Sequence, residues 1–159
     1  MLISSLNPLM ILIRTIDYQQ TYPLRHAILR PGFPLKSCHF KGDSHPNSIH
    51  LGGFEENRMV GILSAIPNPY PENGQRAFQI RGMAVAPSSR KKGVATLLLQ
   101  HFEELCLQEG KIQLLWLNAR IDVQKLYLRN QFTPVGTPFM IEPIGMHQQF
   151  FKSLPHEPV

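Results

Sequence analysis

The sequence has little cysteine, little charge and no long hydrophobic run. Only 2 of the 159 residues are cysteine, and Cys38 and Cys106 lie far apart, in no metal-binding or redox spacing. This excludes a disulfide framework and indicates free thiols in a reducing compartment, so we expect a cytoplasmic protein. Residues 1–16 are apolar, but their longest uninterrupted apolar run is residues 9–13, with no basic residue before it and no small-residue cleavage site after it. We therefore expect residues 9–16 to form the first strand instead of a signal peptide.

Charged residues make up only 17% of the chain, and 16 Lys and Arg stand against 11 Asp and Glu, a net charge of +5. Such a charge suits nucleic acid, an anionic membrane surface or an anionic cofactor. The basic residues cluster only at Arg90, Lys91 and Lys92, without the interleaved aromatic residues of a nucleic-acid groove. We therefore expect no nucleic-acid or membrane partner, and a nucleic-acid-binding protein is the least favoured class. The scattered basic residues are expected on a solvated face: Arg14, Arg25, Arg30, Lys36, Lys41 and Lys152.

The most informative segment joins a buried strand to an amphipathic helix through a basic turn. Residues 78–85 form an apolar strand that Pro87 ends. Regular alternation places Phe78, Ile80 and Ala84 on one face of this strand, and Met83 and Val85 on the other. The helix begins after Gly93 and stops at Gly110, and its apolar residues recur at helical spacing: Val94, Leu97, Leu98, Phe102 and Leu105.

The turn itself has the properties of an anion site. The first turn of a helix leaves its backbone N–H groups without partners, and the helix dipole adds positive charge there. Gly93 allows a ligand to approach the backbone closely, and three cationic side chains precede it. We therefore expect the turn to hold phosphate groups.

The pattern Arg90-x-x-Gly93-x-Ala95 resembles the coenzyme A signature of the GNAT acyl-CoA N-acyltransferases, which lies between the fourth strand and a long helix. This resemblance implies acetyl-CoA as cosubstrate. The cofactor-binding residues that it implies are Met83, Ala84, Val85, Arg90, Lys91, Lys92, Gly93, Val94, Ala95 and Thr96. It also implies that a backbone N–H near Met83 or Val85 polarises the thioester carbonyl, where a local irregularity splays the central strand from the next one.

A second motif follows downstream. Residues 112–118 predict a central strand, and Asp122 is placed to cap the short helix that comes after it. The run Leu126-Tyr127-Leu-Arg-Asn-Gln131-Phe132 is similar to the family's Leu/Phe-Tyr-x-x-x-Gly-Phe, with Gln131 in place of glycine. The resemblance implies that Tyr127 is the general acid that protonates the departing thiolate. At Gln131 we expect a slightly altered helix exit, because a left-handed non-glycine residue costs on the order of 1 kcal/mol.

The general base is not evident. Many relatives place a Glu on the central strand, whereas the polar residues here are Gln79 and Arg81. We expect proton removal through a water chain that ends at His147, Glu142 or His50, with His147 as the named candidate. Asn118, at the end of the next strand, is expected to position substrate or water. No metal site is expected, because the spacings of His39, Asp43, His45 and His50 fit neither a helical His pair nor a zinc pattern.

The remaining patterns complete the expected fold. A helical segment is expected at residues 19–29, an irregular region at 33–47, two strands at 48–54 and 58–65 joined by a short polar turn, and a last strand at 145–151. These predict one α/β (α+β) domain over residues 1–159, with a GNAT-like mixed, mostly antiparallel sheet of about six to seven strands flanked by helices on both faces.

Two functions remain open at this point. The first is transfer of an acetyl group from acetyl-CoA to a primary amine of a small molecule or peptide by direct attack. The alternative is a non-catalytic acyl-CoA-binding sensor or interaction module of the same fold, which the missing base and Gln131 keep open. A monomer and a homodimer are both compatible with the sequence.

Overall fold

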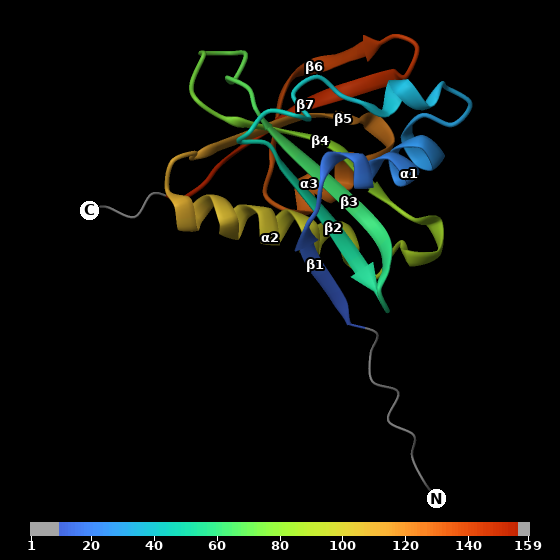
Figure 1. The fold of residues 1–159 in the computed structure, drawn as a ribbon. Helices are drawn as coiled ribbons and strands as arrows, with labels where there is room; N and C mark the ends of the chain where they lie inside the picture. The colour runs from blue at the N-terminus through green and yellow to red at the C-terminus, as the bar shows by residue number, and fades with distance from the viewer. Residues whose placement is uncertain (1–9, 156–159) are drawn as a thin grey trace, which may run out of the picture.

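The structure, a computed structural model, describes residues 10–155, which form one seven-stranded sheet with the strand order β1-β2-β3-β4-β5-β7-β6 (Figure 1). The strands are β1 (Ile11–Thr15), β2 (Ile49–Glu55), β3 (Arg58–Pro67), β4 (Phe78–Val85), β5 (Leu114–Arg120), β6 (Thr133–Ile141) and β7 (Gly145–Ser153). Only β4 and β5 pair in parallel, and every other neighbouring pair is antiparallel. The expected mixed, mostly antiparallel sheet is confirmed.

The elements before β4 agree closely with the sequence pattern. The first strand begins at Ile11, and residue 9 of the expected range lies outside the described residues. The helical segment at 19–29 is a chain of short pieces, namely η1 (Tyr18–Thr21), α1 (Tyr22–Leu24) and η2 (Arg25–Leu29), and the following region contains only the short η3 (Leu35–Cys38). Strands β2 and β3 form a hairpin whose two turn residues, Glu56 and Asn57, both have positive φ. Such two-residue turns match the twist of the paired strands.

Helices cover both faces of the sheet. The long helix α2 (Val94–Glu109) packs on one face, where its buried residues are Val94, Leu98, Leu99, Phe102 and Cys106. Leu97, which the sequence pattern assigned to the apolar face, is 38% exposed. A Cβ on Gly61 of β3 would meet Val94 and Leu98 of α2, whereas a Cβ on Gly82 of β4 would meet Arg25 of η2. The helical segment before β2 therefore covers the opposite face, as Figure 1 shows for α1.

Strand β4 carries a bulge that changes which side chains face α2. The register with β3 advances from Ile62↔Ala84 to Ser64↔Arg81, so β4 has one extra residue there, and Gly82 has a φ of +62°. An extra residue reverses the alternation of side chains beyond it. Met83 and Val85 consequently pack against the same core as Phe78 and Ile80, while Ala84 lies outside that cluster. The expectation that Ala84 shares a face with Phe78 and Ile80 is wrong, because regular alternation does not allow for a bulge.

After α2 the chain departs from the expected pattern in two places. Strand β5 begins at Leu114, two residues later than expected, and is followed by η5 (Ile121–Val123) and α3 (Gln124–Arg129). Asp122 lies inside η5 and makes no side-chain cap to α3, whose N-cap residue is Val123, so the predicted Asp122 cap is wrong. The 3₁₀ turn makes Val123 the N-cap residue, one position after Asp122.

The exit of α3 keeps the geometry that a glycine would give. Gln131 is left-handed, with φ +63°. The backbone N–H of Phe132 donates to the carbonyl of Tyr127 at 3.0 Å, and that of Gln131 donates to the carbonyl of Leu128 at 3.2 Å. These two bonds define a Schellman C-cap, which usually has glycine at the left-handed position. The expected slight alteration of the helix exit is therefore wrong, because Gln131 adopts the left-handed conformation that glycine would have.

Candidate active site

A cavity of about 670 Å³ runs from the N-terminal end of α2 to the space between β4 and β5. The two strands pair only at Phe78↔Leu115 and Gln79↔Trp116, so they separate beyond Gln79. Backbone groups of β4 that face β5 past this point have no strand partner there. The separation and the bulge at Gly82 together form the local irregularity that the sequence resemblance implied. Such unpaired backbone donors suit a carbonyl oxygen that gains negative charge.

The basic turn lies at the other end of this cavity. Gly93 is the N-cap of α2, with φ +81°, and a Cβ built there would meet no atom within 4 Å. The backbone at this end of the helix is therefore open to a ligand. Lys91 is also left-handed, with φ +63°, and the Arg90 guanidinium donates to the carbonyl of Val85 at 3.1 Å. Nine of the ten sequence-predicted cofactor-binding residues line the cavity: Met83, Ala84, Val85, Arg90, Lys91, Gly93, Val94, Ala95 and Thr96.

Lys92 is the one predicted cofactor-binding residue that the structure does not bring into the cavity lining. Its ammonium lies 3.3 Å from the carboxylate of Glu55 at the end of β2. That carboxylate also accepts a hydrogen bond from the buried Ser89 hydroxyl at 3.1 Å. The sequence run predicted a cationic cluster, but the carboxylate that binds Lys92 comes from a strand 37 residues earlier in the chain.

Tyr127 of α3 lines the same cavity and is 4% exposed. Its ring packs against Phe132 and Phe150, at centroid distances of 5.7 and 5.9 Å, which fixes its orientation. Its hydroxyl has no hydrogen-bond partner among residues 10–155. Burial raises the pKa of Tyr127 above its usual value, so the phenol keeps its proton at neutral and mildly alkaline pH. The phenol therefore stays protonated, and its O–H makes no hydrogen bond to the described residues.

A smaller cavity of about 180 Å³ adjoins the first one, and the two share Ile80, Arg81, Gly82, Asn118 and Leu29 in their linings. The Oδ1 atom of Asn118 is buried and has no hydrogen-bond partner among the described residues. A buried acceptor without a donor is costly and marks a place where a ligand N–H would be bound. The structure therefore brings Asn118 to the junction of both cavities.

His147 of β7 lines the smaller cavity and is 6% exposed. Its Nδ1 lies 2.7 Å from the carbonyl oxygen of Gly145. A carbonyl oxygen only accepts, so Nδ1 carries the hydrogen and the neutral ring keeps its lone pair on Nε2. That nitrogen has no partner in the described part of the chain. In its neutral form, His147 thus has an acceptor nitrogen that no described residue uses.

The other two base candidates are not brought to either cavity. His50 is buried on β2, where its Nδ1 lies 2.7 Å from the Ser64 hydroxyl and its Nε2 lies 2.9 Å from the Asp43 carbonyl. Both nitrogens are therefore occupied. Glu142 is exposed in the turn between β6 and β7 and lines neither cavity. The structure thus separates these two residues from His147.

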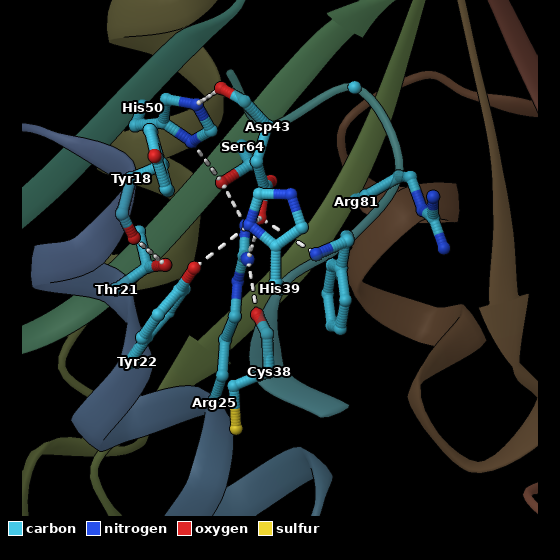
Figure 2. A network of polar contacts seen from close by, with 12 residues as sticks. Tyr18, Thr21, Tyr22, Arg25, Cys38, His39, Asp43, His50, Ser64 and Arg81 are labelled. Carbon is cyan, nitrogen blue, oxygen red and sulfur yellow. Dashed lines mark hydrogen bonds and ion pairs between the residues drawn. The ribbon is translucent and has the colours of Figure 1, made fainter. Parts of the chain in front are cut away.

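A buried polar network was missed by the sequence analysis. Arg25 is 0% exposed, so its expected place on a solvated face is wrong. Its guanidinium makes two bonds to Asp43, at 2.6 and 3.0 Å, and one to the Ser64 hydroxyl at 2.8 Å (Figure 2). Asp43 and Ser64 are 18 and 39 residues away from Arg25 in the chain, so no local sequence pattern predicts these contacts. Among residues 10–155, no group of His, Cys, Asp and Glu side chains converges as a metal site.

The geometry agrees with comparisons to known proteins. Residues 13–132 match the model of the acetyltransferase (GNAT) family. A Bacillus subtilis (strain 168) protein called the uncharacterized N-acetyltransferase YitI is 34% identical over 146 residues, which cover 91% of this chain and 97% of that relative. The chain belongs to the GNAT acetyltransferase family, and it is an acyl-CoA-dependent acyltransferase.

Solved structures confirm the fold. An aminoglycoside 6′-N-acetyltransferase complexed with coenzyme A superimposes with a TM-score of 0.72 at 15% identity, covering 93% of this chain and 99% of that one. Escherichia coli ElaA gives a TM-score of 0.70 at 16% identity, covering 91% of this chain and 100% of that one. Within the described residues, no helix is both long and apolar enough to cross a membrane.

Proposed function

We propose that this protein is an N-acetyltransferase that transfers the acetyl group of acetyl-CoA to a primary amine of a small molecule or peptide by direct attack. The observation that carries the proposal is the continuous cavity of about 670 Å³ that joins the phosphate-binding turn at Gly93 to the unused hydroxyl of Tyr127. A cosubstrate that spans both ends has its phosphates on α2 and its thioester between β4 and β5.

The residues at the helix end fit coenzyme A. The free N–H groups of the first turn of α2, the open backbone at Gly93 and the cations Arg90 and Lys91 together form an anion site for the diphosphate. The bound thioester supplies an activated acetyl group. The unpaired backbone of β4 past Gln79 is the place in the chain where a carbonyl oxygen finds donors.

The transfer requires one bond to form, one to break and two protons to move. The amine nitrogen forms a bond to the acetyl carbon as the bond from that carbon to sulfur breaks. The amine loses a proton to His147 Nε2, directly or through water, and the leaving thiolate takes a proton from the Tyr127 hydroxyl. Asn118 Oδ1 accepts a hydrogen bond from the incoming amine, which holds it at the junction of the two cavities.

Tyr127→Phe tests the proposal. Because the hydroxyl acts on charge that develops only at the departing sulfur, the variant should turn over about a hundredfold more slowly and bind acetyl-CoA with the wild-type affinity. Turnover is measured as acetyl-CoA consumption over a panel of amines and peptides, and affinity by calorimetry. Leu128→Ala is the matched control, because Leu128 is the next residue on α3 and is exposed.

Three outcomes separate the possibilities. Slower turnover with unchanged affinity supports the role of Tyr127. Wild-type turnover in the Phe variant would make the hydroxyl structural, with the thiolate leaving unassisted or protonated by water. Tight acetyl-CoA binding without transfer to any amine, in the wild type as well, would replace the transferase by the acyl-CoA-binding sensor.

A further inference from the structure

Four arginines gather beside the smaller cavity. The guanidinium carbons of Arg25, Arg30 and Arg81 lie 4.1, 5.1 and 5.0 Å from the centre of the same ring, that of Phe40. Arg30 and Arg120 both donate to the carbonyl oxygen of Leu29, at 3.0 and 3.2 Å. Contact with an aromatic face favours each cation, but charges of one sign held this close repel each other. The cluster needs negative charge to balance it.

The nearest carboxylate, that of Asp43, forms an ion pair with only one of the four arginines, Arg25. Asp43 uses Oδ1 for Arg25, and it uses Oδ2 for Arg25 and for the backbone N–H of Phe40, at 2.6 and 2.7 Å. Figure 2 shows Arg81 pointing away from Asp43. Within residues 10–155, Arg30, Arg81 and Arg120 make no ion pair with any carboxylate. These three cations therefore have no ion-pair partner in the described part of the chain, and Asp43 acts on Arg81 only from a distance, where its charge partly opposes the effect of burial on the pKa of Arg81.

Two of these arginines, Arg30 and Arg81, are partly removed from water, which makes their positive charge less favourable. Burial lowers the pKa of Arg81 below its usual value, and burial followed by the charge of Arg120 lowers the pKa of Arg30. Arg30 and Arg81 both line the cavity of about 180 Å³, and no acidic residue lines it. Partly desolvated guanidinium groups around a concave space are a recognition element for carboxylate or phosphate groups.

Resting on the proposed function, we propose that the smaller cavity is the acceptor site and that it selects small amines carrying an anionic group, a carboxylate or a phosphate, which Arg81 and Arg30 bind. The volume is far below the roughly 300–1,000 Å³ of pockets that hold drug-sized ligands, which fits a small acceptor. With its anionic group on the arginines, the amine end of such a molecule extends toward Asn118 and His147, which line the same cavity.

The same charges assist the chemistry. Nearby positive charge disfavours the protonated form of a bound amine and so lowers the pKa of its ammonium group. A larger share of the acceptor is then neutral, which is the form that attacks. The arginines thus supply part of what a strong general base on β4 would otherwise supply. A polycationic acceptor is repelled by this site.

The test compares matched acceptors and matched variants in the full-length protein with acetyl-CoA. The acceptor pairs are 4-aminobutyrate against butylamine, and O-phosphoethanolamine against ethanolamine, with kanamycin as a polycation. The anionic member of at least one pair should show a kcat/KM at least tenfold above its neutral partner. Arg81→Gln should raise KM for that acceptor about tenfold or more without raising it for butylamine. The control is Arg58→Gln, which removes the same charge from an exposed position in the β2–β3 hairpin.

Each outcome bears on a different claim. Preference in the carboxylate pair alone, or in the phosphate pair alone, identifies the anion. Equal or better turnover of neutral amines or kanamycin overturns the anionic-acceptor proposal and leaves the transferase standing. Weaker acetyl-CoA binding in Arg81→Gln, measured by calorimetry, overturns it as well, because the arginine would then act on the cosubstrate.

If no amine is acetylated, the transferase proposal fails while the anion site is still tested. Binding of 4-aminobutyrate and O-phosphoethanolamine is then titrated by NMR against the coenzyme A complex. Loss of binding in both Arg81→Gln and Arg30→Gln supports the site. The same affinity in wild type and variants, or no binding at all, rejects it.

Discussion

Gly93 and Gly110 stand at the two ends of α2 with the same left-handed backbone, at φ +81° and +68°, and a Cβ on either would meet nothing within 4 Å. Replacing either by alanine should cost on the order of 1 kcal/mol of stability. Only Gly93→Ala should weaken acetyl-CoA binding, by about tenfold or more, because Gly93 lines the larger cavity and Gly110 does not. Calorimetry gives the affinity and urea unfolding the stability. Gly110→Ala is the control for backbone strain, and equal acetyl-CoA affinities in the two variants would remove the turn from the cofactor site.

At the scale of single residues, the sequence correctly identified positions where the backbone makes a local turn. Gly93 and Gln131 are examples, because the chain must turn at a helix start or exit whatever packs around it. It did not identify residues whose partners are distant. Lys92 was expected with the anion site and instead pairs with Glu55, while Arg25 was expected in solvent and is fully buried.

At the scale of elements, strands β2 and β7 each carry one buried histidine with a different environment. His50 is held on both nitrogens, and burial lowers its pKa below the usual 6.5. His147 has one nitrogen free and lines a cavity. The two strands therefore separate a histidine that is bonded at both nitrogens from one that lines a cavity with one nitrogen unbonded, although the sequence does not distinguish them.

Replacing each by glutamine should distinguish them. The stability that neutral His50 contributes is complete above about pH 6.5 and is lost as the pH falls through its lowered folded pKa, because the unfolded state then binds more protons. His50→Gln should flatten the decline in unfolding free energy between about pH 7 and pH 5 and leave the turnover of the folded protein near wild type. His147→Gln should lower turnover instead, and less so at high pH, where the acceptor amine is already neutral. Urea unfolding and initial rates across pH give both readouts, and a reversed assignment of the two effects would contradict the geometry.

At the scale of the whole molecule, the Arg25–Asp43 pair joins the N-terminal helical segment and the loop after η3 to β3 beside the β4 bulge. Both side chains are fully buried, and Arg25 also binds the Cys38 carbonyl and Ser64. Gly82 permits this packing, because a Cβ there would lie 3.2 Å from Nε of Arg25. The network thus positions the bulged strand and the loop after η3 relative to one another.

Asp43→Asn should therefore destabilise the protein by about 3 kcal/mol or more, because it leaves a buried guanidinium without its counter-charge. The double variant Arg25→Met, Asp43→Leu should recover part of that loss, since it removes both charges together. Urea unfolding at pH 7.5 measures both effects. A loss in Asp43→Asn below about 1 kcal/mol would mean that the pair behaves like an exposed ion pair.

The sequence by itself determined the order of strands and helices along the chain, the basic turn at the start of α2, the position of Tyr127 on the helix after β5 and the absence of an acidic residue on the central strand. Each of these depends on neighbours within a few residues: hydrophobic period, helix start and stop signals, and a short motif. The left-handed backbone at Gln131 could also be predicted from the second motif, because the free-energy cost of a left-handed non-glycine residue depends on that residue's own backbone.

Only the tertiary structure decided which face Ala84 occupies, which histidine lines the smaller cavity, and which carboxylates pair with Lys92 and Arg25. It also decided that three arginines lie around the ring of Phe40. A bulge reverses the faces of a strand without a signal in its hydrophobic pattern, and the partners of the buried charges come from segments tens of residues apart. The lining of the smaller cavity is assembled from segments far apart in the chain. Electrostatic and packing energies depend on distance in space, whereas the local patterns that predict secondary structure depend on distance along the chain.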